Sequence, residues 1–202
     1  FSASQQSITS SQWLNNVSSP VIARVMDCIY LGNLNAAYSG RALCKNNIDS
    51  IIDMSNLPSD RSLSIIPCTC NRGGLRHSWS RLKVDIQGLL DGKYPVLTES
   101  CFQDINECID ASLEKRKRVL IHCTDGYSLA PTCVIQYLMV KHKMRLMAAY
   151  EFVRARYPLN IRECHQNLLV DLFNDHTVYS SGNPGSCRGH HPRSQSKASQ
   201  QD

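Results

Sequence analysis

The sequence lacks any run of about 18 consecutive apolar residues, so we expect no transmembrane helix. Its first residues, Phe-Ser-Ala-Ser-Gln-Gln-Ser, also lack the basic-then-apolar pattern of a secretory signal. The chain does not begin with Met, which we interpret as the mark of a fragment or a processed chain. Together these absences predict an intracellular protein, cytoplasmic or also nuclear.

Regular cysteine spacing is absent as well, although cysteine itself is not. Cys68 and Cys70 form a C-x-C pair, but no second C-x-x-C or histidine pair accompanies them at zinc-finger spacing. Several of the ten cysteines lie inside apolar segments, which favours buried, reduced thiols over a disulfide scaffold. We therefore expect neither a metal site nor an organic cofactor.

A strong charge bias is missing too, because the formal net charge is only +5. Charged residues make up 19% of the chain and apolar residues 42%, which is ordinary for a globular protein. The basic run at 115–118 is interpreted as a solvated turn. The basic segment 72–81, with Trp79, is either a partner contact or a variable surface loop. We expect protein partners and no nucleic acid.

The 202 residues fit one domain with two tails. Residues 1–18 are rich in Ser, Gln and Asn and predict a flexible N-terminal segment. Residues 19–176 carry the periodic apolar pattern of a folded domain. Residues 177–202 have almost no large apolar side chains and predict a disordered C-terminal tail.

Strands and helices alternate along the predicted domain. The patterns predict a strand or hairpin over 24–32, a helix from the cap Asn33 to about 44, and strands over 48–54, 81–86 and 119–122. Further helices are expected from the cap Thr98 to about 114 and over 131–142, 146–156 and 162–174. This order predicts an α/β fold of three layers, with a mostly parallel central sheet flanked by helices. Ligands of such sheets bind outside the carboxyl ends of the strands.

The segment His122-Cys123-Thr124-Asp125-Gly126-Tyr127-Ser128-Leu129-Ala130-Pro131 lies at such a strand-to-helix turn. Unpaired N–H groups at a helix N-terminus favour a thiolate and can surround a tetrahedral anion. Gly126 permits the tight curl that such a loop needs. We therefore expect Cys123 to be more acidic than an ordinary cysteine, although a small thiol also packs well there without any chemistry.

This turn resembles the His-Cys-x5-Arg-Ser/Thr signature of the protein tyrosine phosphatase superfamily. The sequence is similar to the dual-specificity branch in four further stretches, which are Ile29-Tyr30-Leu31-Gly32-Asn33, Ile51-Ile52-Asp53-Met54-Ser55, Ala149-Tyr150-Glu151-Phe152-Val153 and Pro158-Leu159-Asn160. The helix that follows Pro131 continues the likeness, which covers roughly residues 20–174. The resemblance implies the phosphatase fold and a cysteine nucleophile that forms a phosphocysteine.

Two departures from that signature bear on function. Leu129 stands where the family has Arg, and Ala130 stands where it has Ser or Thr. The family's Arg holds two phosphoryl oxygens, and its hydroxyl assists departure of the cysteine thiolate. Leu supplies neither charge nor hydrogen bond, and no other cation lies inside the loop. We therefore expect a catalytically inactive pseudophosphatase, unless Arg72, Arg76 or Arg162 takes the missing place.

The resemblance also implies roles for other residues. The family's general acid is an Asp upstream of the loop; Asp91 is the first candidate and Asp85 the second, while Asp91-Gly92 is equally a common turn dipeptide. His122 is interpreted as a residue that orients the loop. Residues 122–130 form the phosphate loop, with Cys123 as a vestigial nucleophile.

Three functions remain open on the sequence. The domain is a monomeric module that binds phosphorylated or unphosphorylated signalling proteins, a weakly active cysteine-dependent phosphatase, or a scaffold with a vestigial pocket. An open loop favours binding, whereas a loop filled by Leu129 favours the scaffold.

Overall fold

The computed structural model describes residues 19–57, 65–68, 70, 77–84, 86 and 97–180, apart from the side chains of Glu99 and of residues 175–180. Its centre is a five-stranded sheet in the order β1-β2-β5-β3-β4. β1 pairs with β2 antiparallel, and the other three pairs are parallel. The strands are β1 (Ile22–Arg24), β2 (Ile29–Gly32), β3 (Ser50–Asp53), β4 (Ser80–Lys83) and β5 (Val119–His122).

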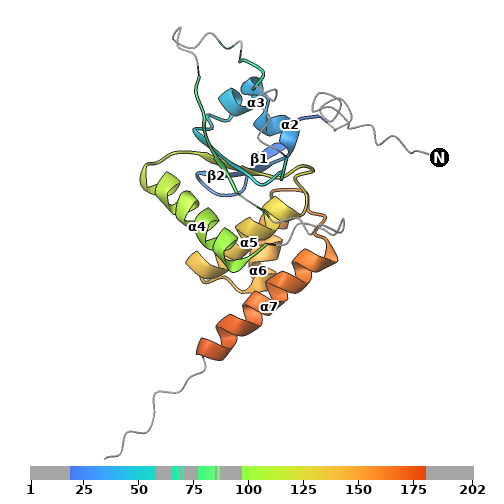
Figure 1. Ribbon diagram of the computed structural model, residues 1–202. Coiled ribbons are helices and arrows are strands. Elements are labelled where there is room, and N and C mark those ends of the chain that lie inside the picture. The colour runs from blue at the N-terminus through green and yellow to red at the C-terminus, as the bar shows by residue number, and fades with distance from the viewer. Residues whose placement is uncertain are drawn as a thin grey trace, which may run out of the picture.

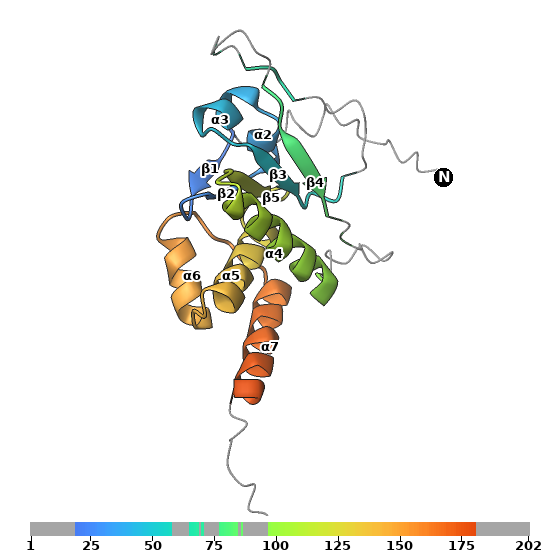
Figure 2. The same ribbon diagram turned by 90° about the vertical axis from the view of Figure 1, so that its left-hand side faces the viewer.

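Helices cover both faces of this sheet (Figures 1 and 2). The short helices α2 (Leu34–Ala37) and α3 (Gly40–Lys45) lie on one face. Four helices pack on the other side: α4 (Glu99–Glu114), α5 (Leu129–Lys141), α6 (Leu146–Arg154) and α7 (Glu163–Ser180). The three-layer α/β architecture predicted from the sequence is confirmed.

The apolar core has one part on each face of the sheet. The larger part joins β2, β5 and the four long helices, and Ile29, Ile105 and Ile121 within it have no exposed surface. The smaller part lies under α2 and α3 and includes Leu43 and Leu120. β2, β3 and β5 are buried at every position, as expected for central parallel strands covered on both faces.

Several predicted boundaries are confirmed by local capping. The Asn33 side chain accepts a hydrogen bond from the Ala36 N–H at 3.0 Å, and Thr98 caps α4 through the Cys101 N–H. The single helix predicted over 33–44 is wrong, because the chain forms α2 and α3 instead. Ser39 starts the second helix by accepting from the Ala42 N–H at 3.2 Å.

The last helix is longer than the periodicity predicted. α7 continues to Ser180, beyond position 174 and into the first residues of the expected tail. The division into a flexible start, a domain and a disordered tail otherwise stays a prediction, because residues 1–18 and 181–202 lie outside the described part of the chain. Within the described residues, no helix combines the length and the apolar character needed to cross a membrane.

Leu120 offers a test of the smaller core. Its side chain is fully buried between β5 and the short helices. We expect Leu120→Ala to lower the free energy of unfolding by about 2–5 kcal/mol, because it removes apolar contacts and leaves a cavity. Urea unfolding measures the change. Met147→Ala, at a side chain that is 66% exposed, should stay within about 0.5 kcal/mol of the parent; equal losses in both variants would contradict this core.

Candidate functional site

The loop between β5 and α5 places Cys123 at the carboxyl end of the central strand. Its sulfur is almost wholly buried, with 3% of the residue exposed. Gly126 adopts φ +85°, and a Cβ there would lie 2.7 Å from the Tyr157 hydroxyl oxygen. Glycine is therefore required both by the backbone curl and by the close packing. The Thr124 hydroxyl donates to the Ser55 carbonyl at 3.2 Å and anchors the loop to the segment after β3.

The surroundings of the Cys123 thiol oppose its ionisation. Burial raises the pKa of Cys123 to about 11; hydrogen bonds from the Ala130 and Gly126 N–H groups act in the other direction but do not compensate. The thiol donates to Asp125 Oδ1 at 3.5 Å, and this carboxylate raises the pKa further. The prediction of an unusually acidic Cys123 is therefore wrong, because burial and a neighbouring anion outweigh the helix N-terminus.

Asp125 also holds the shape of the loop and forms an ion pair. Its Oδ1 accepts a hydrogen bond from the Tyr127 N–H at 3.0 Å. Its Oδ2 lies 3.3 Å from Arg162 Nη2, just before α7. Both of these paired side chains are nearly half exposed, so the ion pair lies at the pocket mouth.

A pocket of about 190 Å³ opens above Cys123. Arg162 is the only Lys or Arg among the described residues that line it. The other two arginines named as possible replacements, Arg72 and Arg76, lie outside the described residues. The pocket is lined by Met54, Ser55, Cys123, Thr124, Asp125, Ser128, Leu129, Arg162 and His165.

The two residues that depart from the signature are part of the core. Leu129 is 6% exposed, and Ala130 has no exposed surface. Both begin α5 and pack with the larger apolar cluster, while Leu129 also forms part of the pocket wall. The loop is thus neither an empty anion cradle nor a pocket filled completely by Leu129.

Sequence reasoning missed a polar cluster beside this pocket. Ser128 Oγ accepts a hydrogen bond from the Arg162 N–H at 2.9 Å and lies 2.7 Å from His165 Nδ1. A hydroxyl can donate one hydrogen bond and accept two, so Ser128 can bond to both partners at once. His165 is buried and lies 37 residues from Ser128 in the chain. Only the fold brings the two together, so no local motif indicated the pair.

A second polar cluster lies under the start of the loop. Asp53 Oδ2 accepts from Arg81 Nη1 at 3.0 Å, and the same nitrogen lies 3.3 Å from His122 Nε2. Burial acts to raise the pKa of Asp53, but His122, two hydrogen bonds from Ser55 and Arg81 together lower it. Burial lowers the pKa of His122 to about 4. A neutral His122 that accepts from Arg81 fits this position, and its loop-orienting role stays a prediction.

The candidate general acids cannot be placed. Asp91 and Asp85 both lie outside the described residues. Of the predicted phosphate loop 122–130, His122 ends β5, residues 123–128 form the turn, and Leu129 and Ala130 begin α5. The catalytic and phosphate-binding roles assigned to these residues from the resemblance stay predictions.

Comparison with known proteins gives one consistent relationship. The family described as dual specificity phosphatase, catalytic domain, matches residues 29–174. Human dual specificity protein phosphatase 4 is 46% identical over 57 residues, which cover 28% of this chain and 14% of that protein. Rat dual specificity protein phosphatase 5 is 27% identical over 132 residues, which cover 65% of this chain and 30% of that protein. The chain thus spans less than a third of the length of these relatives.

Solved structures share the fold at low sequence identity. The human tyrosine phosphatase-like serine/threonine/tyrosine-interacting protein aligns with a TM-score of 0.58 at 22% identity, covering 79% of this chain and 98% of that one. A leucine-rich repeat and phosphatase domain containing protein from Entamoeba histolytica gives a TM-score of 0.57 at 20% identity, covering 86% of this chain and all (100%) of that one.

The buried His122 predicts a pH-dependent stability. Its pKa is about 4 in the folded chain against 6.5 for an ordinary histidine, so the unfolded chain binds an extra proton between these values. Stability should therefore fall as the pH is lowered through this window, by about 3 kcal/mol in full. Asp53, whose pKa is lowered, adds a further loss only below about pH 4, near its ordinary range. Urea unfolding between pH 7 and 4.5 measures the slope, which should flatten in His122→Gln; an unchanged slope in that variant would rule out His122 as its source.

Cys123 should react slowly with alkylating reagents. A pKa of about 11 against the ordinary 9.0 lowers the thiolate fraction at neutral pH about 100-fold. We expect iodoacetamide to modify the exposed Cys164 well before Cys123, as followed by peptide mass spectrometry. Asp125→Asn should speed modification of Cys123 by removing the neighbouring charge, whereas Asp27→Asn, at an exposed carboxylate, should not. Faster labelling of Cys123 than of Cys164 in the parent chain would contradict the buried, protonated thiol.

Proposed function

The chain belongs to the dual specificity phosphatase family, and on that premise we propose that it is a pseudophosphatase, a member that keeps the fold and has lost hydrolysis of phosphate esters. It acts instead as a binding, scaffolding or regulatory module in intracellular signalling. The observation that carries the proposal is the position of Asp125. Its carboxylate faces the sulfur that the family uses as its nucleophile, and the one Lys or Arg among the described residues that line the pocket, Arg162, is paired with that carboxylate.

This carboxylate disfavours each state of the phosphatase reaction. A phosphate group bound above Cys123 would place its negative charge beside Asp125. Two like charges 4 Å apart near a protein surface repel by about 4 kcal/mol at an effective dielectric constant of 20. Burial and, to a lesser extent, this carboxylate raise the pKa of the Cys123 thiol, so the thiolate nucleophile is scarce before substrate arrives.

The loss of the signature arginine adds to this barrier. An arginine that completes a phosphoryl-transfer site contributes about 10³ to 10⁵ in rate, by analogy with GTPases. Leu129 packs in the core and carries no charge, so no change of its rotamer could supply the contacts of the missing arginine. Ala130 offers no hydroxyl to assist release of a phosphocysteine.

The pocket supports partner binding that does not depend on phosphate. Its single described cation, Arg162, is paired with Asp125, so an incoming phosphate would have to displace an existing ion pair. Recognition of an unphosphorylated signalling protein through the domain surface meets no such competition. We therefore favour a monomeric scaffold over a phosphopeptide receptor.

A second candidate function rests on Arg162 itself. This side chain lines the same pocket as Cys123 and is 45% exposed, so it has room to leave Asp125. A guanidinium that turned toward a bound phosphate would supply part of the missing charge. The result would be a slow, cysteine-dependent phosphatase, and its rate would depend on both Cys123 and Arg162.

Steady-state hydrolysis of a small aryl phosphate separates these candidates. We expect the 202-residue chain to show the same rate as its Cys123→Ser variant. A rate that is lost in Cys123→Ser and in Arg162→Gln, but kept in Cys164→Ser, would overturn the pseudophosphatase and establish the alternative. Binding of inorganic phosphate, measured by calorimetry, should likewise be absent at millimolar concentration.

Restoring the signature offers a positive control. Leu129→Arg with Ala130→Ser should raise Cys123-dependent activity above background, because the nucleophile and the glycine curl are present. Adding Asp125→Ala should raise it further, since this removes the negative charge beside the Cys123 sulfur. Circular dichroism confirms that the variants fold. A folded triple variant without any activity would show that the lesion extends beyond these three positions.

A further inference from the structure

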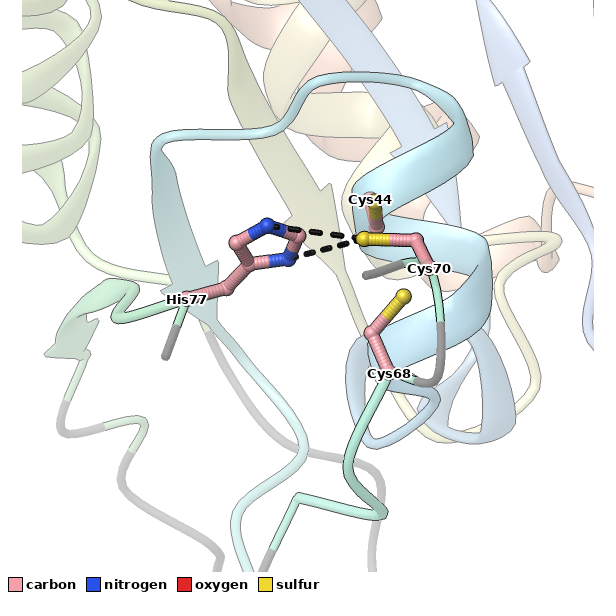
Figure 3. Close-up of side chains that lie close together, drawn as sticks. All are labelled: Cys44, Cys68, Cys70 and His77. Atoms are coloured by element: carbon pink, nitrogen blue, oxygen red, sulfur yellow. Dashed lines mark hydrogen bonds between the residues drawn. The ribbon is translucent and has the colours of Figure 1, made fainter. Parts of the chain in front are cut away.

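Three cysteines and one histidine converge beside α3, on a part of the molecule that the phosphatase loop does not use (Figure 3). Cys44 comes from α3, Cys68 and Cys70 from the connection between β3 and β4, and His77 from the residues just before β4. Their ligand atoms all lie within 4.8 Å of one another. We propose that these four side chains bind one zinc ion as a closed, structural site.

The distances fit a tetrahedral ion. Zinc binds sulfur at about 2.3 Å and imidazole nitrogen at about 2.0 Å, which sets sulfur–nitrogen edges of about 3.6 Å and sulfur–sulfur edges of about 3.8 Å. Cys70 Sγ lies 3.6 Å from His77 Nε2 and 3.9 Å from Nδ1. The most distant pair in the cluster has to approach by only about 1 Å to reach the ideal edge.

The donor set selects zinc among the common metals. Soft thiolate ligands exclude calcium and magnesium, and one mononuclear set of three cysteines and one histidine is a familiar structural zinc arrangement. With four protein ligands no coordination position remains for water or substrate, so the ion is structural. The His77 ring meets Trp79 edge to face with centroids 5.7 Å apart, and Trp79 packs against the smaller core cluster. This contact fixes the imidazole that the metal needs.

The backbone presents Cys68 to α3 independently of any metal. The Gly40 N–H donates to the Ile66 carbonyl at 2.8 Å, and the Ile66 N–H donates to the Tyr38 carbonyl at 2.9 Å. A Cβ at position 40 would lie 2.4 Å from the Ile66 oxygen and 2.6 Å from the Cys68 nitrogen. Glycine at this position is therefore what allows the cysteine-bearing segment to approach the helix that carries Cys44.

The connection between β3 and β4 has few other stabilising contacts among its described residues. β3 and β4 are parallel, and a helix usually connects such strands, yet the described residues between them contain none. Apolar burial holds the described part of this connection only weakly, because Ile65 is partly buried against the smaller core cluster while Ile66 is 64% exposed. β4 is itself an edge strand with three of its four residues exposed. A zinc ion that joined α3, the connection and the entry to β4 would fix all three.

The spacing of the four ligands along the sequence does not match a known zinc-binding motif. The expectation of no metal rested on the lack of a second cysteine or histidine pair near Cys68 and Cys70. The remaining ligands are single residues, one upstream on a helix and one downstream before a strand. They meet only because the parallel crossover brings β4 back beside β3 and α3.

Metal analysis of the 202-residue chain tests the proposal. We expect mass spectrometry of the elements to find one zinc per chain after purification under reducing conditions. Cys44→Ser and His77→Gln should each lower the affinity for zinc more than about 100-fold, as measured by competition with a chromophoric chelator. Residues that only hydrogen-bond to a metal ligand already contribute about 10–100-fold to metal affinity. Cys164→Ser, at an exposed cysteine outside the cluster, should keep the parent's zinc.

Two further measurements guard against variants that fail to fold. Cobalt added to the zinc-free parent chain should give the visible absorption of a tetrahedral thiolate site. Cys70→His should retain stoichiometric metal, whereas Cys70→Ser should lose it. Zinc that persists in Cys44→Ser, zinc that is lost in Cys123→Ser, or a disulfide within the cluster after reducing purification would each overturn the proposal. None of these outcomes depends on whether the chain hydrolyses phosphate esters.

Discussion

One guanidinium, that of Arg81, joins most of the elements on which the loop depends. It binds Asp53 at the end of β3, lies against His122 at the end of β5 and donates to the Ala37 carbonyl at the end of α2. It also lies 4.4 Å from the centre of the Tyr38 ring. The side chain is largely buried, and a buried charge is tolerated only when it is paired and hydrogen-bonded in this way. These contacts therefore hold the ends of β3 and β5 in one arrangement. Because Cys123 is the residue after the end of β5, its position is set by the same contacts.

Much of the fold could be predicted because its signals are local. Asn33 and Thr98 are N-cap residues that mark the starts of their helices, and the short apolar run before Cys123 is typical of a central strand covered on both faces. The break between α2 and α3 was missed because Ser39 competes with a helical pattern that would otherwise continue through it. The far end of α7 was missed because few apolar residues mark its last turns.

The candidate site was predicted in its residues but not in its electrostatics. A helix N-terminus is visible in the sequence, whereas the burial of Cys123 and the direction of Asp125 are properties of the folded loop. The ion pair between Asp125 and Arg162, the Ser128–His165 contact and the four-ligand cluster share this feature. Each joins residues that are distant in the chain, and a single sequence carries no signal for such contacts. The family relationship supplied the fold, and the local geometry supplied the argument about activity.

The burial of Leu129 has a consequence for how this lineage can change. A lone return to arginine at this position would place a cation among apolar side chains, and its opposite charge, Asp125, is already engaged. Such a step costs stability before any function is regained, so selection for stability opposes it. Any further substitution that improves packing around Leu129 increases the stability cost of replacing it by arginine. In the proposed pseudophosphatase, a return to arginine thus carries a stability penalty that substitutions at the domain's surface do not.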